Sequence, residues 1–253
     1  MALLDVKNLS KSFGGVHAVE DVSFAVSEGV IYSVIGPNGA GKTTLFNLVT
    51  GIYTPSGGEI HLDGTHIVGR PPHDLAAMGV ARTFQNLQVC MNMSAMENVM
   101  VGAHLHLDRH LIKAMLRLPK MAAREKALRE EVAELMRFVG LERYLDSRAE
   151  SMPYGALKRL EVARALAARP RLLFLDEPAA GLNPKETGEI DELVRKIAAS
   201  GVTVVLVEHD MKLVMNLSHY ILVLDYGKKL AEGTAEEVRN NPEVITAYLG
   251  AHA

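Results

Sequence analysis

Short apolar runs alternate with helix-like stretches along most of this chain. Residues 30–36 (VIYSVIG), 171–176 (RLLFLD) and 202–209 (VTVVLVEH) are mostly apolar and short, as expected for buried strands. Residues 42–51 and 184–200 have the length and spacing of helices. Strands that alternate with helices favour a mostly parallel sheet covered on both faces. The pattern therefore predicts an α/β core.

Two other regions differ from this core. Residues 17–26 and 57–67 alternate roughly between apolar and polar side chains and contain turn glycines, which indicates a small antiparallel β layer. From about residue 94 to 140 strand patterns disappear, which predicts an inserted helical subdomain, and Pro119 is expected to divide it into separate helices. Its apolar stripe consists of Leu128, Val132, Leu135, Met136 and Val139.

Composition narrows the class of protein. A chain of 253 residues with 48% hydrophobic content can bury one large core with a subdomain. The net charge of −3 gives no basic excess for nucleic acid, and the single cysteine, Cys90, suits a reducing compartment. The first residues have no basic flank followed by an apolar run, so we expect no signal peptide, and the apolar runs are far shorter than the roughly 18 to 20 residues that span a bilayer. Any membrane role is therefore expected to come through a partner.

The stretch GPNGAGKT fits the phosphate-binding pattern G-x-x-x-x-G-K-[ST] between an expected strand and an expected helix. Its glycines let backbone N–H groups surround phosphate oxygens, and the helix N-terminus adds its dipole. Lys42 supplies positive charge to the β and γ phosphates, and Thr43 offers a hydroxyl to Mg²⁺. The loop therefore predicts binding of a nucleoside triphosphate. The expected contacts are Gly36, Asn38, Gly39, Ala40, Gly41, Lys42, Thr43 and Thr44.

Two carboxylates follow the apolar strand in LLFLDEP. Asp176 is placed to hold Mg²⁺ through its water shell, and Glu177 to orient or deprotonate the water that attacks the γ phosphate. The alternative is that both carboxylates merely face solvent where the strand leaves the core. Beside a phosphate-binding loop, the pair favours hydrolysis of the bound nucleoside triphosphate.

In order, the chain shows GPNGAGKT, TFQN, MPYGALKRLEVARAL, LLFLDEP, AAGLNP and EHD, and over essentially its whole length it resembles the ATP-binding cassette family. The resemblance implies an ATPase subunit of a membrane transporter that uses ATP and Mg²⁺. It places Gln85 near Mg²⁺ and the transmembrane partner, and His209 at the γ phosphate. Phe13 corresponds to the aromatic that stacks on adenine, and Asn183 belongs to a loop at the dimer seam. Each residue alone also has an ordinary structural explanation.

The signature motif departs from the family pattern. The family usually has Leu-Ser-Gly-Gly-Gln, whereas residues 152–156 read MPYGA. Pro153 stands at the serine, so a hydroxyl that caps the partner subunit's ATP is missing, while the Gly155 N–H and the helix dipole remain. Proline is compatible with a helix start, so we expect weakened capping. The next stretch is predicted to be an amphipathic helix that packs through Leu157, Leu160 and Leu166.

The resemblance implies one nucleotide-binding domain over residues 1–253. Residues 1–88 and 160–253 are assigned to the core with its antiparallel layer, and residues 89–159 to the helical subdomain that carries the signature. Two such subunits, identical or related, would enclose two ATP molecules and act on transmembrane permease subunits. A solute-binding protein would be an indirect partner, nucleic acid would not be one, and the expected location is the cytoplasmic face of the inner membrane.

Within the family, RTFQN, DEPAAGLNPKET, EHDMKLVM and NNPEVITAYLG resemble ATPase subunits of importers for branched-chain or other hydrophobic amino acids. One alternative is the ATPase of a lipopolysaccharide-type exporter. A second is a soluble, non-transport cassette acting on ribosomes or DNA, although such proteins usually carry two cassettes or a long coiled-coil insertion. A third is a nonhydrolytic regulatory module, which the presence of Glu177 and His209 disfavours.

Three minor patterns remain. His106 and His110 lie one helical turn apart, a spacing that can hold a transition metal, but a solvated helix face is favoured because no third ligand is evident. The charges of residues 124–135 also indicate an exposed face. Thr234 and Glu237 fit a capping box.

Overall fold

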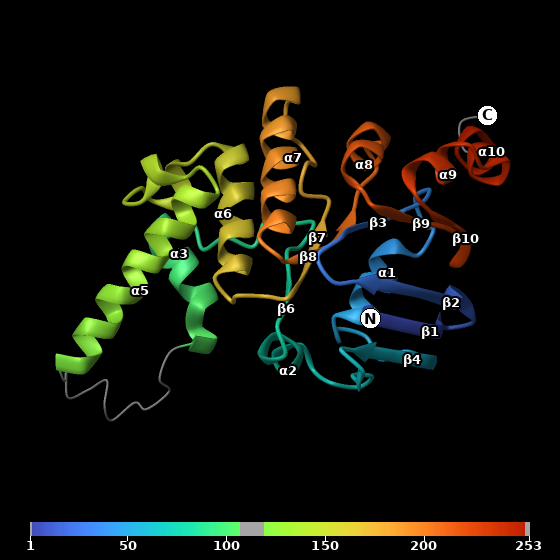
Figure 1. Cartoon of the computed structure of the whole chain (residues 1–253), viewed down its shortest axis with the longest axis horizontal. Helices are drawn as coiled ribbons and strands as arrows, with labels where there is room; N and C mark the ends of the chain where they lie inside the picture. Colours follow the sequence, from blue (N-terminus) through green and yellow to red (C-terminus); the bar gives the residue numbers. More distant parts are fainter. Residues whose placement is uncertain (1, 107–118, 251–253) are drawn as a thin grey trace.

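The main sheet has six strands in the order β10-β9-β3-β8-β7-β6 in a computed structural model, which describes residues 2–106 and 119–250 (Figure 1). Neighbouring strands are parallel except β9 and β10, which are antiparallel. The predicted mostly parallel sheet is confirmed. Its strands are β3 (Ile31–Ile35), β6 (Val80–Arg82), β7 (Leu172–Asp176), β8 (Thr203–Val207), β9 (Tyr220–Asp225) and β10 (Lys228–Gly233).

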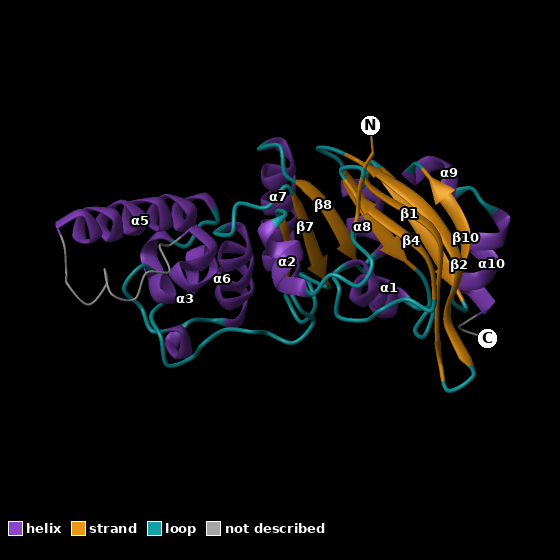
Figure 2. Ribbon diagram, turned by 90° about the horizontal axis from the view of Figure 1, so that it is seen from below, coloured by secondary structure: helices purple, strands orange, loops and turns teal. Residues whose placement is uncertain are grey.

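A second, antiparallel sheet has the order β2-β1-β4-β5 and confirms the predicted β layer (Figure 2). One hydrophobic cluster joins this sheet, helix α1 and one face of the main sheet, with Leu4, Phe46 and Phe174 among its members. The two sheets therefore fix the position of α1 between them. The elements are β1 (Ala2–Phe13), β2 (Val16–Ser27), β4 (Gly57–Leu62), β5 (Thr65–His66) and α1 (Lys42–Val49).

Helices cover the rest of the main sheet and extend beyond its β6 edge (Figures 1 and 2). Leu173 and Leu206 share a hydrophobic cluster with α7 and with the helical region, so this region and the sheet have a continuous core. The helices are α2 (Pro72–Ala77), α3 (Ala95–Gly102), η1 (Ala103–His106), α5 (Pro119–Phe138), η2 (Glu142–Tyr144), η3 (Ala149–Ser151), α6 (Tyr154–Leu166), α7 (Pro184–Ala199), α8 (Met211–Leu217), α9 (Ala235–Arg239) and α10 (Pro242–Gly250).

Helix α5 has the predicted two-sided character. It begins at Pro119, and in the stripe Leu128, Val132, Met136 and Val139 are buried while the remaining leucine is partly buried. The charged residues on its other side are exposed. The hydrophobic spacing alone was therefore sufficient to orient this helix.

Helix α6 is not amphipathic, so that prediction is wrong. Leu157, Leu160 and Leu166 are buried as expected, but so are Lys158 and Glu161, which a one-sided helix would expose. The reason is that α6 packs against α3 and α5 while also contacting β6. The helix runs through the boundary proposed at residues 159 and 160, so the helical region and the core share it.

Glycine is required at residue 102 because α3 and α6 approach each other closely. A Cβ atom there would overlap the carbonyl oxygen of Arg164. We expect Gly102→Ala to lower the free energy of unfolding by about 1–3 kcal/mol, the usual cost of overpacking. Gly188→Ala is the matched control, because a Cβ in that part of α7 meets open space and should stabilise by about 0.5–1 kcal/mol. Urea unfolding of both variants measures the difference; equal effects would contradict the close approach.

Three smaller predictions have different outcomes. The capping box at α9 is confirmed, with the Thr234 N–H donating to Glu237 Oε2 at 2.7 Å and the Glu237 N–H donating to Thr234 Oγ1 at 3.3 Å. Of the histidine pair, His110 lies outside the described residues. Among the helices that the structure describes, none has the length and apolar character needed to cross a membrane.

Candidate functional site

The predicted phosphate-binding loop connects β3, whose residues are all buried, to the start of α1. Gly36 and Gly41 are needed for space, since a Cβ would overlap the carbonyl oxygen of Leu224 at the first and that of Ala18 at the second. The loop is therefore pressed between β2 and the end of β9. Among its other predicted contacts, Asn38, Gly39 and Thr43 are exposed, Thr44 is half-buried and Ala40 is buried.

Lys42 lies within this loop, and only 8% of the residue is exposed. Its Nζ donates to the carbonyl oxygens of Gly36 at 2.7 Å and Pro37 at 2.9 Å. Burial lowers the pKa of Lys42, while the negative charges of Glu177 and Asp176 oppose that shift. The loop thus holds a cation close to two carboxylates at the end of β7.

Asp176 is the last residue of β7 and is 3% exposed. Its Oδ2 accepts a hydrogen bond from Arg82 at 2.9 Å, whereas its Oδ1 makes no hydrogen bond within the described part of the chain. A carboxylate oxygen and the exposed Thr43 hydroxyl are donor types that Mg²⁺ prefers, usually together with substrate phosphates and water. The residues present therefore fit a magnesium site.

Glu177 follows in the left-handed backbone region, at φ 49°. Such a conformation is uncommon for a residue with a side chain and recurs at functional sites. Its Oε2 accepts from Gln85 Nε2 at 3.0 Å, and its Oε1 lies 3.4 Å from His209 Nδ1. The structure thus brings together Gln85, Glu177 and His209, three site residues that the sequence places in three separate segments.

The loop around Gln85 (residues 83–88, the Gln85 loop) is held by buried charges of α6. The backbone N–H groups of Phe84 and Gln88 donate to Glu161 Oε1 at 3.4 and 3.3 Å, and Lys158 Nζ lies 3.5 Å from the Gln85 carbonyl oxygen. Burial raises the pKa of Glu161, while these N–H donors oppose the shift. Helix α6 and the Gln85 loop are therefore connected directly.

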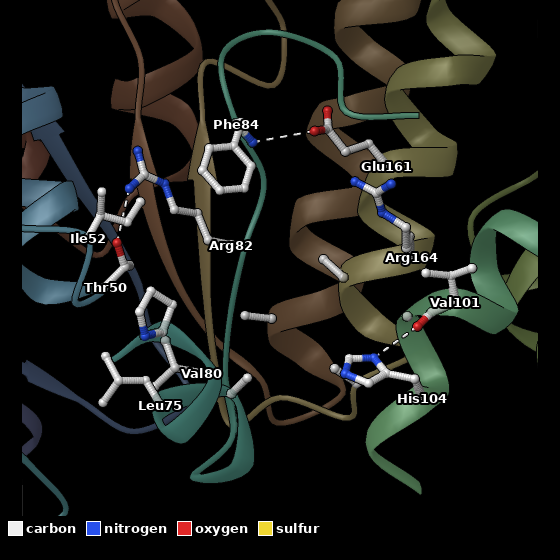
Figure 3. Close-up of a pocket in the computed structure, with 16 residues that line it drawn as sticks. Thr50, Ile52, Leu75, Val80, Arg82, Phe84, Val101, His104, Glu161 and Arg164 are labelled. Atoms are coloured by element: carbon white, nitrogen blue, oxygen red, sulfur yellow. Dashed lines mark hydrogen bonds between the residues drawn. The ribbon is translucent and has the colours of Figure 1, made fainter. Parts of the chain in front are cut away.

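A groove of about 370 Å³ opens beside the Gln85 loop, between α2 and β6 on one side and α3 and α6 on the other (Figure 3). Ile52, Phe84 and Val101 are among the exposed apolar residues that line it. Arg82 and Glu161 also line the groove, and their side chains are largely buried. The groove thus joins an exposed surface to side chains that contact the site.

The start of α6 contains the divergent signature. Pro153 is the N-cap and provides no side-chain hydrogen bond, and both Pro153 and Tyr154 are exposed. Gly155 is buried, and a Cβ there would collide with the carboxylate of Glu186. Asn183 is the N-cap of α7, where its Oδ1 accepts the N–H of Glu186 at 3.1 Å. The signature at the start of α6 and the loop that ends at Asn183 therefore both lie against Glu186.

Phe13 lies at the end of β1 and is partly exposed. Its ring contacts Tyr53 edge to face, with the ring centres 5.4 Å apart, and Lys11 Nζ lies 5.0 Å from its centre. Tyr53 follows α1 and was not predicted as a site residue. The two exposed rings stand at 73° to each other, so they do not form one flat surface, and a planar base could stack on only one of them at a time.

Comparison with known proteins agrees with this arrangement. Residues 19–180 match the family model "ABC transporter", and residues 228–253 match the model "Branched-chain amino acid ATP-binding cassette transporter". Over 249 residues, 98% of each chain, the protein is 47% identical to the "High-affinity branched-chain amino acid transport ATP-binding protein BraF" of Pseudomonas aeruginosa. It is 46% identical over the same length to the corresponding protein LivG of Salmonella typhimurium.

The chain belongs to the ABC transporter family. This ABC ATPase also resembles solved cassettes over nearly its whole length. A nucleotide-free ATP-binding cassette from an ABC transporter is 31% identical, with a TM-score of 0.85 and coverage of 98% of this chain and 99% of that one. A cassette in its ADP conformation is 30% identical, with a TM-score of 0.86 and coverage of 99% of both chains. The predicted family and fold are confirmed.

The sequence did not predict the positions of several polar residues around the site of this ABC ATPase. Arg82 contacts Asp176, and Glu161 contacts the Gln85 loop. In the sequence, each is indistinguishable from an ordinary surface charge of a helix or strand. Glu208 is also buried, and its carboxylate accepts the N–H groups of Ala179 at 2.9 Å and His209 at 3.2 Å. Its one available signal was an acidic residue placed directly after a buried strand.

Proposed function

We propose that this ABC ATPase powers an importer of branched-chain amino acids. The observation that carries the proposal is the match of residues 228–253 to the branched-chain amino acid cassette model, because the ATPase core itself is common to many transporters. The named transport proteins BraF and LivG, aligned over 98% of their lengths, support it. These matches favour an amino-acid importer over a lipopolysaccharide-type exporter and over a soluble, non-transport cassette.

In the proposed mechanism the phosphate-binding loop and Lys42 bind the β and γ phosphates of ATP. Glu177 orients the attacking water and accepts its proton, while Gln85 and His209 hold the Glu177 carboxylate from two sides. The water oxygen bonds to the γ phosphorus as the bond to the β-γ bridging oxygen breaks, which gives ADP and phosphate.

The residues proposed to hold Mg²⁺ are Asp176 and Thr43, with Gln85 nearby. Bound there, the ion supplies positive charge to the phosphate oxygens during transfer. Asp176 keeps one carboxylate oxygen without a hydrogen-bond partner in the described structure, which supports this role.

A second ABC ATPase subunit, identical or related, is proposed to complete each site. Strands β7 and β8 lie between α6 and α1 in both views (Figures 1 and 2). The uncapped start of α6, with Pro153 and the Gly155 N–H, is therefore better placed to serve ATP bound by another chain. Asn183 would lie at the seam. Residues 1–88 and 160–253 would act as the core and residues 89–159 as the helical subdomain, with α6 shared between them across this boundary.

The membrane partner is proposed to be a pair of permease subunits, with a solute-binding protein acting through them. The groove beside the Gln85 loop suits an apolar segment of a permease, because its exposed lining includes Phe84 and Val101. This contact would hold the chain at the cytoplasmic face of the inner membrane. The solute itself would be bound by the other subunits.

Reconstitution of the ABC ATPase with its permeases in proteoliposomes tests the import proposal. We expect the solute-binding protein loaded with leucine to raise ATP hydrolysis several-fold, and the same receptor without amino acid to raise it less. A second arm replaces leucine with a charged amino acid at equal concentration. Stimulation by the charged amino acid alone, or by none of the amino acids, would contradict the proposal.

A further inference from the structure

Arg82 contacts Asp176, two aromatic rings and two polar side chains near the end of α1. It ends β6, and its side chain is 7% exposed. Its guanidinium carbon lies 5.6 Å from the ring centre of Phe46 and 5.0 Å from that of Phe84, so aromatic rings restrict its movement. Figure 3 shows Arg82 beside Phe84. A charged group enclosed in this way has a fixed position rather than a solvated, variable one.

The guanidinium group connects two elements of the site. Its NH1 donates to Thr50 Oγ1 at 3.0 Å (Figure 3) and to Asn47 Oδ1 at 2.6 Å, both near the end of α1. Its NH2 donates to Asp176 Oδ2 at 2.9 Å. Because the guanidinium is planar and rigid, fixing NH1 also fixes the direction from which NH2 approaches the carboxylate. A lysine ammonium would keep the charge but could not reproduce this two-sided geometry.

We infer that Arg82 is a positioning residue for Asp176. By occupying Oδ2, it fixes the carboxylate plane and leaves Oδ1 as the oxygen for Mg²⁺. Partners that orient metal-binding carboxylates typically change metal affinity 10- to 100-fold when replaced. The inference rests on the proposed role of Asp176 toward Mg²⁺.

The test measures how nucleotide binding depends on Mg²⁺. The bound fraction of the β,γ-imido analogue of ATP is followed by calorimetry as free Mg²⁺ is raised, which avoids hydrolysis. We expect Arg82→Lys to raise the midpoint in free Mg²⁺ about tenfold while leaving the affinity measured in EDTA unchanged. Arg171→Lys is the matched control, since this exposed arginine pairs with Asp63 and Glu28 away from the site, and its midpoint should equal that of the unmodified chain.

A double-mutant cycle separates positioning from a general structural effect. In an Asp176→Asn background, Arg82→Lys should cause no further shift of the Mg²⁺ midpoint. An unchanged midpoint in folded Arg82→Lys, or an equal shift in both backgrounds, would overturn the inference. If Asp176→Asn alone leaves the midpoint unchanged, the proposed role of Asp176 and the inference fail together, whereas the import proposal is judged by the receptor experiment.

A second variant serves if thermal unfolding shows that Arg82→Lys does not fold. Asn47→Ala removes one NH1 partner and leaves the contact with Asp176 in place. It should shift the Mg²⁺ midpoint in the same direction by about two- to threefold, because the guanidinium is then less firmly held. No shift in this folded variant would count against Arg82 as a positioning residue.

Discussion

Glu177→Gln is expected to bind ATP with an affinity close to that of the unmodified chain but to hydrolyse it roughly 10²- to 10⁴-fold more slowly. This range is the usual contribution of general acid-base catalysis. The amide keeps the size of the side chain and can still hydrogen-bond near Gln85 and His209, but it cannot accept a proton from water. Lys42 donates to backbone carbonyl oxygens of the loop, and the loop glycines pack against backbone, so neither contact involves the Glu177 carboxylate. ATP binding through them should therefore be unaffected.

Phosphate release and calorimetric ATP binding should be measured on the same preparation of this variant. Glu192→Gln is a matched control, since it makes the same substitution at an exposed position of α7 and should leave turnover unchanged. Sedimentation with MgATP adds a test of the two-subunit site, because ATP that is not hydrolysed should favour the associated form. Turnover at the normal rate would move the general base to another residue.

The phosphate-binding loop was predictable from the sequence because its requirements are local. Gly36, Gly41 and Lys42 act within one turn between a strand and a helix, so eight consecutive residues contain the information. The same is true of the α9 capping box and of the stripe on α5, each of which follows from spacing along one element. Local patterns of this kind also predicted the α/β core and the antiparallel layer.

Contacts between distant segments were not predictable in the same way. Arg82 and Asp176 are 94 residues apart, and Glu161 is 77 residues from Phe84, so no spacing rule connects them. The error at α6 has a related cause. A helix in contact with neighbours on several sides buries polar side chains that have partners, and periodicity registers only the apolar ones.

The grouping of Gln85, Glu177 and His209 was only partly predictable from the sequence. Their order along the chain suggested their roles through family resemblance, but only the parallel arrangement of β7 and β8 brings Glu177 and His209 to one edge of the sheet. The site thus depends on both the local motifs and the topology that aligns the ends of the strands.

Lys42→Ala is expected to reduce ATP affinity more than tenfold. Lys42 places a positive charge inside the phosphate-binding loop, and each charge-assisted hydrogen bond that it gives to a phosphate oxygen is worth about 1.5–3 kcal/mol. Because about 1.4 kcal/mol corresponds to a factor of ten, the loss of even one such bond reaches that threshold. The carbonyl oxygens of Gly36 and Pro37 also lose their donor, which loosens the loop.

Calorimetry with MgATP measures the effect of this substitution, and Lys42→Met separates charge from packing. Methionine fills much of the space of the lysine stem but brings no donor, so its affinity should fall nearly as far as that of Lys42→Ala. Lys185→Ala, at an exposed position of α7, should bind ATP normally. ATP should raise the unfolding temperature of this control but scarcely that of either Lys42 variant, because a ligand stabilises a protein only as far as it binds the folded state. Normal affinity in Lys42→Met would show that the side chain serves packing, and the phosphate-binding role of Lys42 would have to be abandoned.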